Sequence, residues 1–163
     1  MPSPEQNFII KKSSISGSGV FNDKEIKKGQ TICFLTGELC THDEIMKRIN
    51  EGKEMLSDPL EVSDEEYLDL DEIPRTFNHS CNPNSYIRGK NELIALFDIS
   101  AGEEITYDYS TTMNDNSNWT CTCNCGGKDC RGIIAPFRSL SKKFQQFYVS
   151  NKFMPNFLLK KFE

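Results

Sequence analysis

The sequence predicts a mainly β fold with few short helices and a metal-binding cysteine cluster toward its C-terminal end. Short apolar runs separated by glycine and other turn residues recur between positions 8 and 109. Helical periodicity is confined to two short segments, and four of the seven cysteines lie within residues 121–130. With 163 residues, the chain is long enough for one domain with its own core and too short for two ordinary ones.

The expected strands are short and are bounded by turn residues. They cover residues 8–10, 20–21, 31–35, 60–62, 67–68, 93–97 and 105–109. Thr41 and Glu44 have the spacing of a helix capping box, which predicts a helix that ends near Gly52. A second helical stripe, expected to pack in the core, precedes Pro155 and consists of Leu140, Phe144, Phe147 and Tyr148. Residues 110–118 have the composition of a loop.

Composition limits the class of protein. The net charge is −5 and the isoelectric point is about 5.2, which disfavours nucleic-acid binding because such proteins usually carry a basic face. No run of 18 apolar residues predicts a membrane span, and the first residues lack the features of a secretory signal. We therefore expect a soluble protein of a reducing compartment, the cytoplasm or the nucleus. The sequence leaves the oligomeric state open.

An acidic stretch runs from residue 54 to residue 72, with nine acidic residues and no lysine or arginine. One interpretation is a solvated and partly flexible loop. The other is a surface whose field attracts a basic peptide, because clustered like charge steers partners of opposite charge.

The strongest local motif contains Cys123, Cys125 and Cys130. Cysteines two residues apart in extended chain point to the same side, and the glycine pair between Cys125 and Cys130 lets the chain fold back. A structural zinc site takes four ligands, so the residues alone leave Cys81 and Cys121 as candidates for the fourth. Four thiolates leave no open position for substrate, so such a zinc would be structural. The alternative is a set of free thiols.

Three further motifs are weaker when each is taken alone. Gly17-Ser-Gly19 lacks the third glycine of a dinucleotide-binding loop. The segment 78–84, with His79 close to Cys81, allows a cysteine nucleophile with its base, but we expect the two side chains to point apart. The third motif is an alternating segment, 102–109, with tyrosines at 107 and 109.

In sequence order these four motifs resemble the SET-domain protein-lysine methyltransferase family, with a post-SET zinc-binding segment. The family pattern G-x-G-[LV]-F matches residues 17–21, and R-F-x-N-H-S-C-x-P-N matches residues 75–84 except that Thr76 replaces its phenylalanine. The patterns G-E-E-[LI]-T-[FY]-D-Y and C-x-C-x4-C match residues 102–109 and 123–130. The resemblance implies a SET-type fold of several small curved sheets, with a pseudo-knot formed around the N-H-S-C and D-Y segments.

The resemblance also implies a division of the chain and a set of partners. The SET domain would span residues 1–112, with its core at 8–109 and a variable insert at 41–72. The post-SET segment would span 113–132, and a C-terminal extension with a short helix 133–163. The implied cofactors are S-adenosylmethionine and a structural Zn²⁺ ion. The implied substrate is a lysine in a histone tail or another basic protein, with no direct nucleic-acid or membrane contact.

Site residues follow by matching the motifs position by position. The residues expected to hold the cofactor are Gly17, Ser18, Gly19, Tyr67, Asn78 and His79. The expected zinc ligands are Cys81, Cys123, Cys125 and Cys130, which leaves Cys121 as a free thiol or as an exchanging ligand. Trp119 would stack on the adenine or simply pack.

Two tyrosines carry the expected chemistry. Tyr109 is the predicted catalytic residue, and Tyr107 stands where the family varies between Phe and Tyr, which predicts mainly mono-methylation. The family pattern Y-x-G-E is not met, because Leu35 replaces its tyrosine. A catalytically weak SET domain that binds peptide, a plain zinc-stabilised interaction domain and a secreted effector that acts on host proteins remain alternatives.

Overall fold

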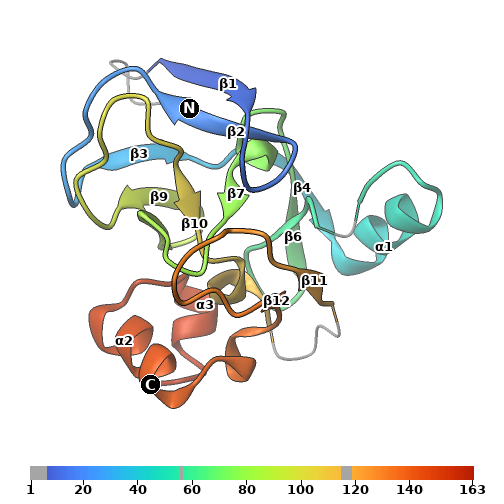
Figure 1. Ribbon diagram of the computed structural model, residues 1–163. Coiled ribbons are helices and arrows are strands. Elements are labelled where there is room, and N and C mark those ends of the chain that lie inside the picture. The colour runs from blue at the N-terminus through green and yellow to red at the C-terminus, as the bar shows by residue number, and fades with distance from the viewer. Residues whose placement is uncertain (1–6, 56, 115–118) are drawn as a thin grey trace.

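The computed structural model describes residues 7–55, 57–114 and 119–163, and its chain is built mainly from short strands (Figure 1). The strands are β1 (Phe8–Lys12), β2 (Ser18–Asn22), β3 (Thr31–Phe34), β4 (Gly37–Thr41), β5 (Leu60–Glu61), β6 (Glu66–Leu70), β7 (Asn78–His79), β8 (Ser85–Arg88), β9 (Glu92–Ala95), β10 (Thr106–Tyr107), β11 (Cys121–Thr122) and β12 (Ile133–Ile134). The helices are α1 (His42–Asn50), α2 (Lys142–Asn151) and α3 (Asn156–Leu159), and the 3-10 turns are η1 (Pro74–Thr76), η2 (Tyr109–Thr112) and η3 (Phe137–Ser139). This composition confirms the predicted mainly β class.

The strands of the described residues form five small sheets rather than one large sheet. Two of the sheets have three strands, in the orders β3-β9-β8 and β4-β6-β5. Three are two-stranded pairs: β1-β2, β11-β12 and β7-β10. Of these five sheets, only the last has a parallel pairing, and it joins segments 28 residues apart in sequence, with Asn78 opposite Thr106 and His79 opposite Tyr107. The two central sequence motifs therefore lie side by side in the middle of the molecule (Figure 1).

Apolar residues from these sheets meet in one main core. Its fully buried members include Val20, Ile32, Leu35, Phe77, Ile87, Leu93, Ile99 and Ile105, which come from almost every part of residues 20–105. Strand β9 contributes consecutive buried residues because it is the central strand of its sheet, covered on both sides. Burial of this kind contributes about 25 cal/mol per Å² of apolar surface, so the core holds the small sheets together although none is large.

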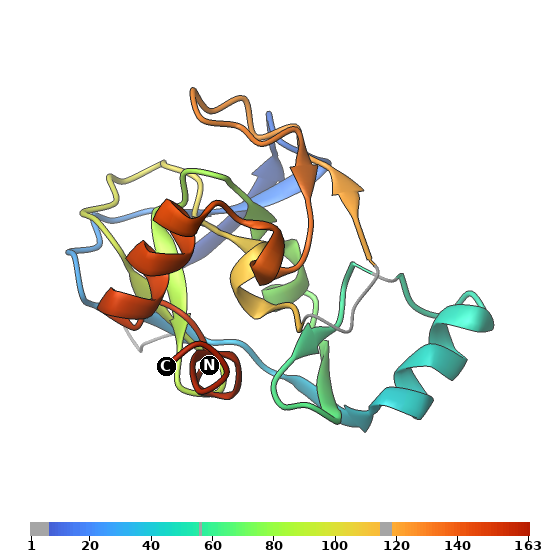
Figure 2. The ribbon, with the colours of Figure 1, turned by 90° about the horizontal axis from the view of Figure 1, so that it is seen from below.

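The first predicted helix is confirmed as α1, and its capping box is present. The Thr41 hydroxyl accepts the Glu44 backbone N–H at 3.3 Å, and the Glu44 carboxylate accepts the Thr41 N–H at 2.8 Å. Only Ile45 is buried on this helix, which projects from the body of the molecule at the edge of the β4-β6-β5 sheet (Figures 1 and 2).

The second predicted helical stripe is confirmed as α2, with Leu140 two residues before the helix begins. Leu140 and Tyr148 are buried in a separate cluster with Phe137, Met154 and Leu158, while Phe147 is 41% exposed. Figure 2 shows α2 and α3 packed on the opposite side of the molecule from α1. None of the helices in the described ranges is both long and apolar enough to cross a membrane.

One local expectation needs correction. Residues 110–112 belong to a 3-10 turn and are buried, although their composition suggested an exposed loop. The Asp108 carboxylate accepts the Ser110 N–H at 3.0 Å and so caps this turn, which satisfies polar residues that would otherwise favour solvent. Residues 115–118 of the expected loop, and the first six residues examined for a secretory signal, lie outside the described residues.

Candidate active site and metal centre

The glycine motif and the Asn78 side chain form one unit. The Asn78 amide Nδ2 donates to the carbonyl oxygens of Ser16 and Ser18, at 3.1 and 2.9 Å, and to Glu104 Oε1 at 2.8 Å. Gly17 has φ +46°, a conformation that glycine adopts without strain. A Cβ on Gly19 would lie 2.1 Å from Glu104 Oε1, so any other residue here would displace the Glu104 carboxylate from its hydrogen bonds. The predicted loop residues and Asn78 are therefore brought together.

Glu104 is a member of this unit that the sequence did not single out. Its carboxylate also accepts the Ser13 hydroxyl, at 2.8 and 2.9 Å, so it ties the start of the glycine loop to the segment before β10. The signal was present in the sequence, because Glu104 belongs to the motif at 102–109. Its long-range partners were not predictable from that motif.

The His79 side chain is buried and uses both ring nitrogens inside the protein. Its Nδ1 accepts the Tyr109 backbone N–H at 3.1 Å, so in the neutral ring Nε2 carries the proton. That nitrogen lies 3.3 Å from Cys81 Sγ, which corrects the expectation that the two side chains point apart. Residues 79 and 81 are two apart in extended chain and therefore share a side. Burial lowers the His79 pKa to about 4, so the ring is neutral near pH 7.

The two predicted catalytic tyrosines lie together, with ring centroids 4.9 Å apart. The Tyr109 hydroxyl donates to the Phe77 carbonyl at 2.6 Å, and its ring meets that of His79 at 5.5 Å. The Tyr107 hydroxyl has no hydrogen-bond partner in the described part of the chain, although the residue is only 5% exposed. Burial raises the pKa of both phenols, that of Tyr109 well above its ordinary value, so both stay protonated near neutral pH.

A cavity of about 530 Å³ opens in front of these tyrosines. The α1 helix supplies one apolar wall with Ile45, Met46 and Ile49, and the rest of the lining includes Leu60, Glu61, Asp64, Tyr67, Tyr107, Tyr109, Met113 and Trp119. The glycine loop and Asn78 are not among the lining residues. Tyr67 thus lines the same cavity as Tyr107 and Tyr109, whereas the glycine loop does not line it. Burial raises the pKa of Tyr67 to about 12.

Two arginines from neighbouring segments partly neutralise the acidic stretch at residues 54–72. Arg75 pairs with Glu54 at 3.4 Å and with Asp69 at 3.0 Å, and Arg48 also contacts Asp69. At the cavity wall, the buried Glu61 accepts the Asn114 N–H at 2.8 Å, and Asp64 accepts the Asn114 side chain. The stretch is therefore neither a simple solvated loop nor a uniform negative surface. Of its two acidic residues on the cavity wall, Glu61 is buried and Asp64 also pairs with Lys161.

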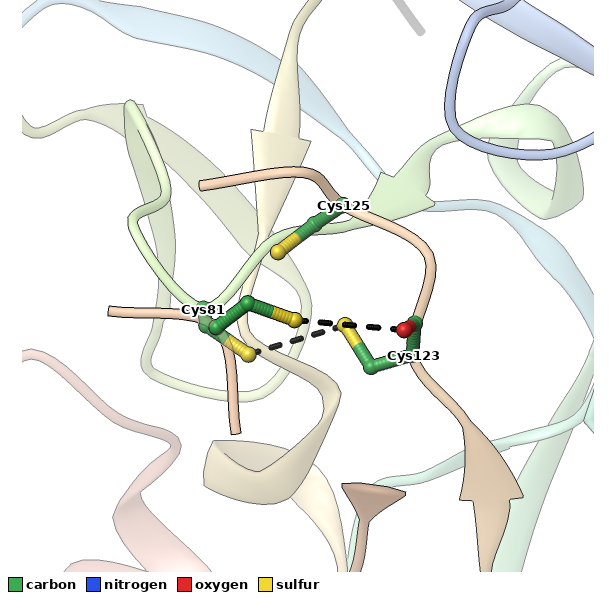
Figure 3. A group of neighbouring side chains, drawn as sticks. Cys81, Cys123 and Cys125 are labelled. Carbon is green, nitrogen blue, oxygen red and sulfur yellow. Dashed lines mark hydrogen bonds between the residues drawn. The ribbon is translucent and has the colours of Figure 1, made fainter. Parts of the chain in front are cut away.

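The four predicted metal ligands come together. The sulfur atoms of Cys81, Cys123, Cys125 and Cys130 all lie within 4.8 Å of one another. Figure 3 shows Cys81, Cys123 and Cys125 turned toward a common centre, with 3.6 Å between the sulfurs of Cys81 and Cys123. In a tetrahedral zinc site with bonds of about 2.3 Å, neighbouring sulfurs are about 3.8 Å apart. The residues therefore form a site that can hold such an ion.

The surroundings of Cys81 also suit a metal-bound thiolate. The Arg131 backbone N–H donates to its sulfur at 3.4 Å, and the protonated His79 Nε2 points at the same atom. Cys121 is exposed and does not belong to the cluster. Trp119 packs beside the cluster and also lines the cavity.

Comparison with known proteins defines the class. The family model described as the SET domain matches residues 17–110, more than half of the chain. The chain belongs to the SET-domain family. Its matching segment is 36% identical, over 140 residues, to the "Variant-silencing SET domain-containing protein" of Plasmodium falciparum, and covers 74% of this chain but 6% of that protein. It is 32% identical to the human "Histone-lysine N-methyltransferase 2B", covering 77% of this chain and 5% of that protein. The chain thus spans a small part of these relatives.

Solved structures agree with this assignment. The methyltransferase domain of human histone-lysine N-methyltransferase SETMAR superposes with a TM-score of 0.66 and 26% identity, covering 81% of this chain and 59% of that chain. KRYPTONITE, solved with methylated DNA, an H3(1–15) peptide and SAH, gives a TM-score of 0.63 at 22% identity, over 80% of this chain and 30% of that chain. The similarity to KRYPTONITE, at this low identity, supports the fold of this chain. The predicted SET-type fold and family are confirmed.

Proposed function

We propose that this chain transfers a methyl group from S-adenosylmethionine to the ε-amine of a lysine in a basic protein or peptide. The observation that carries the proposal is the β7-β10 pairing. It brings Tyr107 and Tyr109, from one motif, against Asn78 and His79, from another, at the wall of a cavity. The SET-domain family to which the chain belongs, with human histone-lysine N-methyltransferase 2B among its relatives, supports the same reaction.

The residues suited to the cofactor are the loop Gly17–Gly19, Asn78, the backbone of His79 and Tyr67. At Gly17 nothing lies within 4 Å of an added Cβ, so a ligand can approach the backbone there, and the Asn78 amide holds the loop in place by donating to the carbonyl oxygens of Ser16 and Ser18. When bound, S-adenosylmethionine supplies an electrophilic methyl group on a sulfonium, which a neutral amine can displace. Cys81, Cys123, Cys125 and Cys130 would hold a structural zinc that fixes the 113–132 segment beside the SET domain (1–112), followed by the extension (133–163).

Tyr109 orients the reactants in this proposal and does not act as a base. Its phenol is protonated and donates a hydrogen bond, so it cannot accept the lysine proton near neutral pH. The amine instead loses its proton to water before or during entry, because an apolar wall and a nearby positive charge both lower the pKa of a lysine. Alignment of two bound reactants supplies about 7–11 kcal/mol of the barrier reduction.

The proposed substrate is a lysine with basic neighbours, such as a histone tail or a ribosomal protein, in the cytoplasm or the nucleus. Glu61 and Asp64 give the cavity wall acidic groups for a cationic side chain, which would share Asp64 with Lys161, and the apolar face of α1 suits the stem of a lysine. The structure of KRYPTONITE with an H3 peptide supports a peptide of this kind.

Radiolabel transfer tests the proposal. The protein is incubated with labelled S-adenosylmethionine and a mixture of core histones, and labelled lysines are identified by mass spectrometry. Calorimetry with S-adenosylhomocysteine separates the alternatives. A weak SET domain that serves as a peptide-binding module, favoured by the buried Leu35 in place of a site tyrosine, would bind without transfer. A plain zinc-stabilised interaction domain would bind no cofactor.

Replacing Tyr107 by phenylalanine should change the product and not the reaction. The unpartnered Tyr107 hydroxyl is available to hold a water at the amine, which leaves room for mainly one methyl group. We expect the wild type to give mono-methyl lysine and Tyr107→Phe to give mostly di- and trimethyl lysine, measured by mass spectrometry of a peptide at long reaction times. Abundant trimethylation by the wild type would contradict this.

The pH dependence of the methyl-transfer rate should follow deprotonation of the substrate lysine and not ionisation of Tyr109. We expect kcat/KM to rise from about pH 7 to about pH 10 as the free amine is deprotonated, because kcat/KM reports the unbound reactants and the ordinary lysine pKa lies near 10.4. Since burial raises the Tyr109 pKa well above 10, its phenol stays protonated over this range and the rate should not fall. Circular dichroism at each pH controls for unfolding. A bell-shaped profile with a fall below about pH 10, in folded protein, would show that Tyr109 ionises there.

A further inference from the structure

The Asp108 carboxylate lies behind the tyrosine pair and is fully buried, with a side-chain exposure of 0%. Arg131 donates to it through both terminal nitrogens, at 2.9 and 2.7 Å, in a bidentate pair. Tyr148 donates its hydroxyl to Asp108 Oδ2 at 3.1 Å. A buried carboxylate is costly unless it is paired in this way, so the three residues act as one unit.

This unit connects three parts of the chain. Asp108 caps the turn η2, whose first residue is Tyr109, by accepting the Ser110 N–H. Arg131 follows the last cysteine of the cluster, and its backbone N–H donates to Cys81 Sγ at 3.4 Å. Tyr148 lies on α2, beyond the residues that the SET family model matches.

The extension is anchored at three other places, so Tyr148 is held in a fixed position. The rings of Tyr86 and Phe153 meet at a tilt with centroids 4.5 Å apart, and the Asn156 N–H donates to the Gly89 carbonyl at 2.8 Å. Lys161 pairs with Asp64 on the cavity wall. The cluster around Phe137 and Tyr148 fills the space between these anchors.

We propose that Tyr148 is a positioning residue for methyl transfer: its hydroxyl, through Asp108, fixes the turn that carries Tyr109, so the C-terminal extension completes the active site. The inference rests on the proposed function. A hydrogen bond to a buried charged group is among the stronger ones in a protein, and small misplacements of a reacting group reduce rates severely. The Tyr148 phenol remains a donor because burial raises its pKa.

The test compares Tyr148→Phe with Tyr86→Phe in the full chain. Both variants remove one tyrosine hydroxyl from the interface of the extension, but Tyr86 has no contact with Asp108. We expect Tyr148→Phe to lower kcat roughly tenfold with little change in KM for either substrate, and Tyr86→Phe to match the wild type. Binding of S-adenosylhomocysteine, followed by calorimetry, should be unchanged in both.

A double-mutant cycle separates positioning from general destabilisation. If Tyr148 acts through Tyr109, Tyr148→Phe should cost almost nothing further in the Tyr109→Phe background. An equal loss in both backgrounds, or a wild-type rate for Tyr148→Phe in an active enzyme, overturns the inference and leaves the proposed function intact. A wild type that methylates no lysine although it is folded overturns the proposed function, and the inference with it.

Discussion

Replacing Tyr109 by phenylalanine should lower kcat about 100-fold while the protein stays folded and still binds S-adenosylhomocysteine. The hydroxyl that is removed donates to the Phe77 carbonyl at 2.6 Å and lies between the two central motifs. It is the only atom lost, since the phenyl ring keeps its contacts with His79 and Tyr107. Single-turnover methyl transfer, with the chemical step isolated from product release, is the appropriate measurement.

Tyr107→Phe is the matched control for this variant. It removes a hydroxyl from the neighbouring ring, 4.9 Å away, that has no partner in the described part of the chain. We expect it to keep a rate within a few fold of the wild type while it changes the number of methyl groups added. Equal losses in the two variants would show that both act through packing. A Tyr109→Phe variant with an unaltered rate would remove Tyr109 from the chemistry.

The local features of this chain were predictable because their causes are local. A capping box depends on residues three apart, and α1 begins where Thr41 and Glu44 place it. The spacing of Cys123, Cys125 and Cys130 likewise predicted that the three sulfurs meet, as they do. The fourth member could not be chosen on spacing. Cys81 is 42 residues from Cys123 in the chain, and only the family resemblance favoured it over Cys121.

The features that were missed depend on contacts between distant segments. Asp108 lies in the D-Y motif and Tyr148 in the predicted helical stripe, but no local pattern shows that Arg131 and Tyr148 share the Asp108 carboxylate. The error over His79 and Cys81 had a different origin, since the geometry of extended chain was sufficient to place them on one side. The helix of the extension was predictable from its apolar stripe, but the bidentate pair and the contact of Tyr148 with Asp108 became visible only from the fold.

Loss of the metal should have the other large effect, because the cysteine cluster ties the post-SET segment to Cys81 of the SET domain. The described part of that segment is otherwise held by the Arg131–Asp108 pair, the hydrogen bonds of Asn114, the two-residue strand pair β11-β12 and a small cluster around Cys81, Cys123 and Ile134. A structural zinc in small domains contributes on the order of 10–16 kcal/mol to folding. We therefore expect Cys81→Ser to lose its zinc, measured by elemental analysis, and to lower methyl transfer more than 100-fold.

The main core should survive this change, because it is formed by other residues, from Val20 to Tyr107. Circular dichroism should therefore still show a folded protein, and treatment of the wild type with a strong chelator should reproduce the loss of activity. Cys121→Ser is the matched control, since Cys121 is exposed and lies outside the cluster, and it should keep one zinc per chain and a normal rate. If Cys121→Ser loses zinc while Cys81→Ser retains it, the metal is held by the other cysteine, and Cys81 would serve only as the hydrogen-bond acceptor of His79 and Arg131.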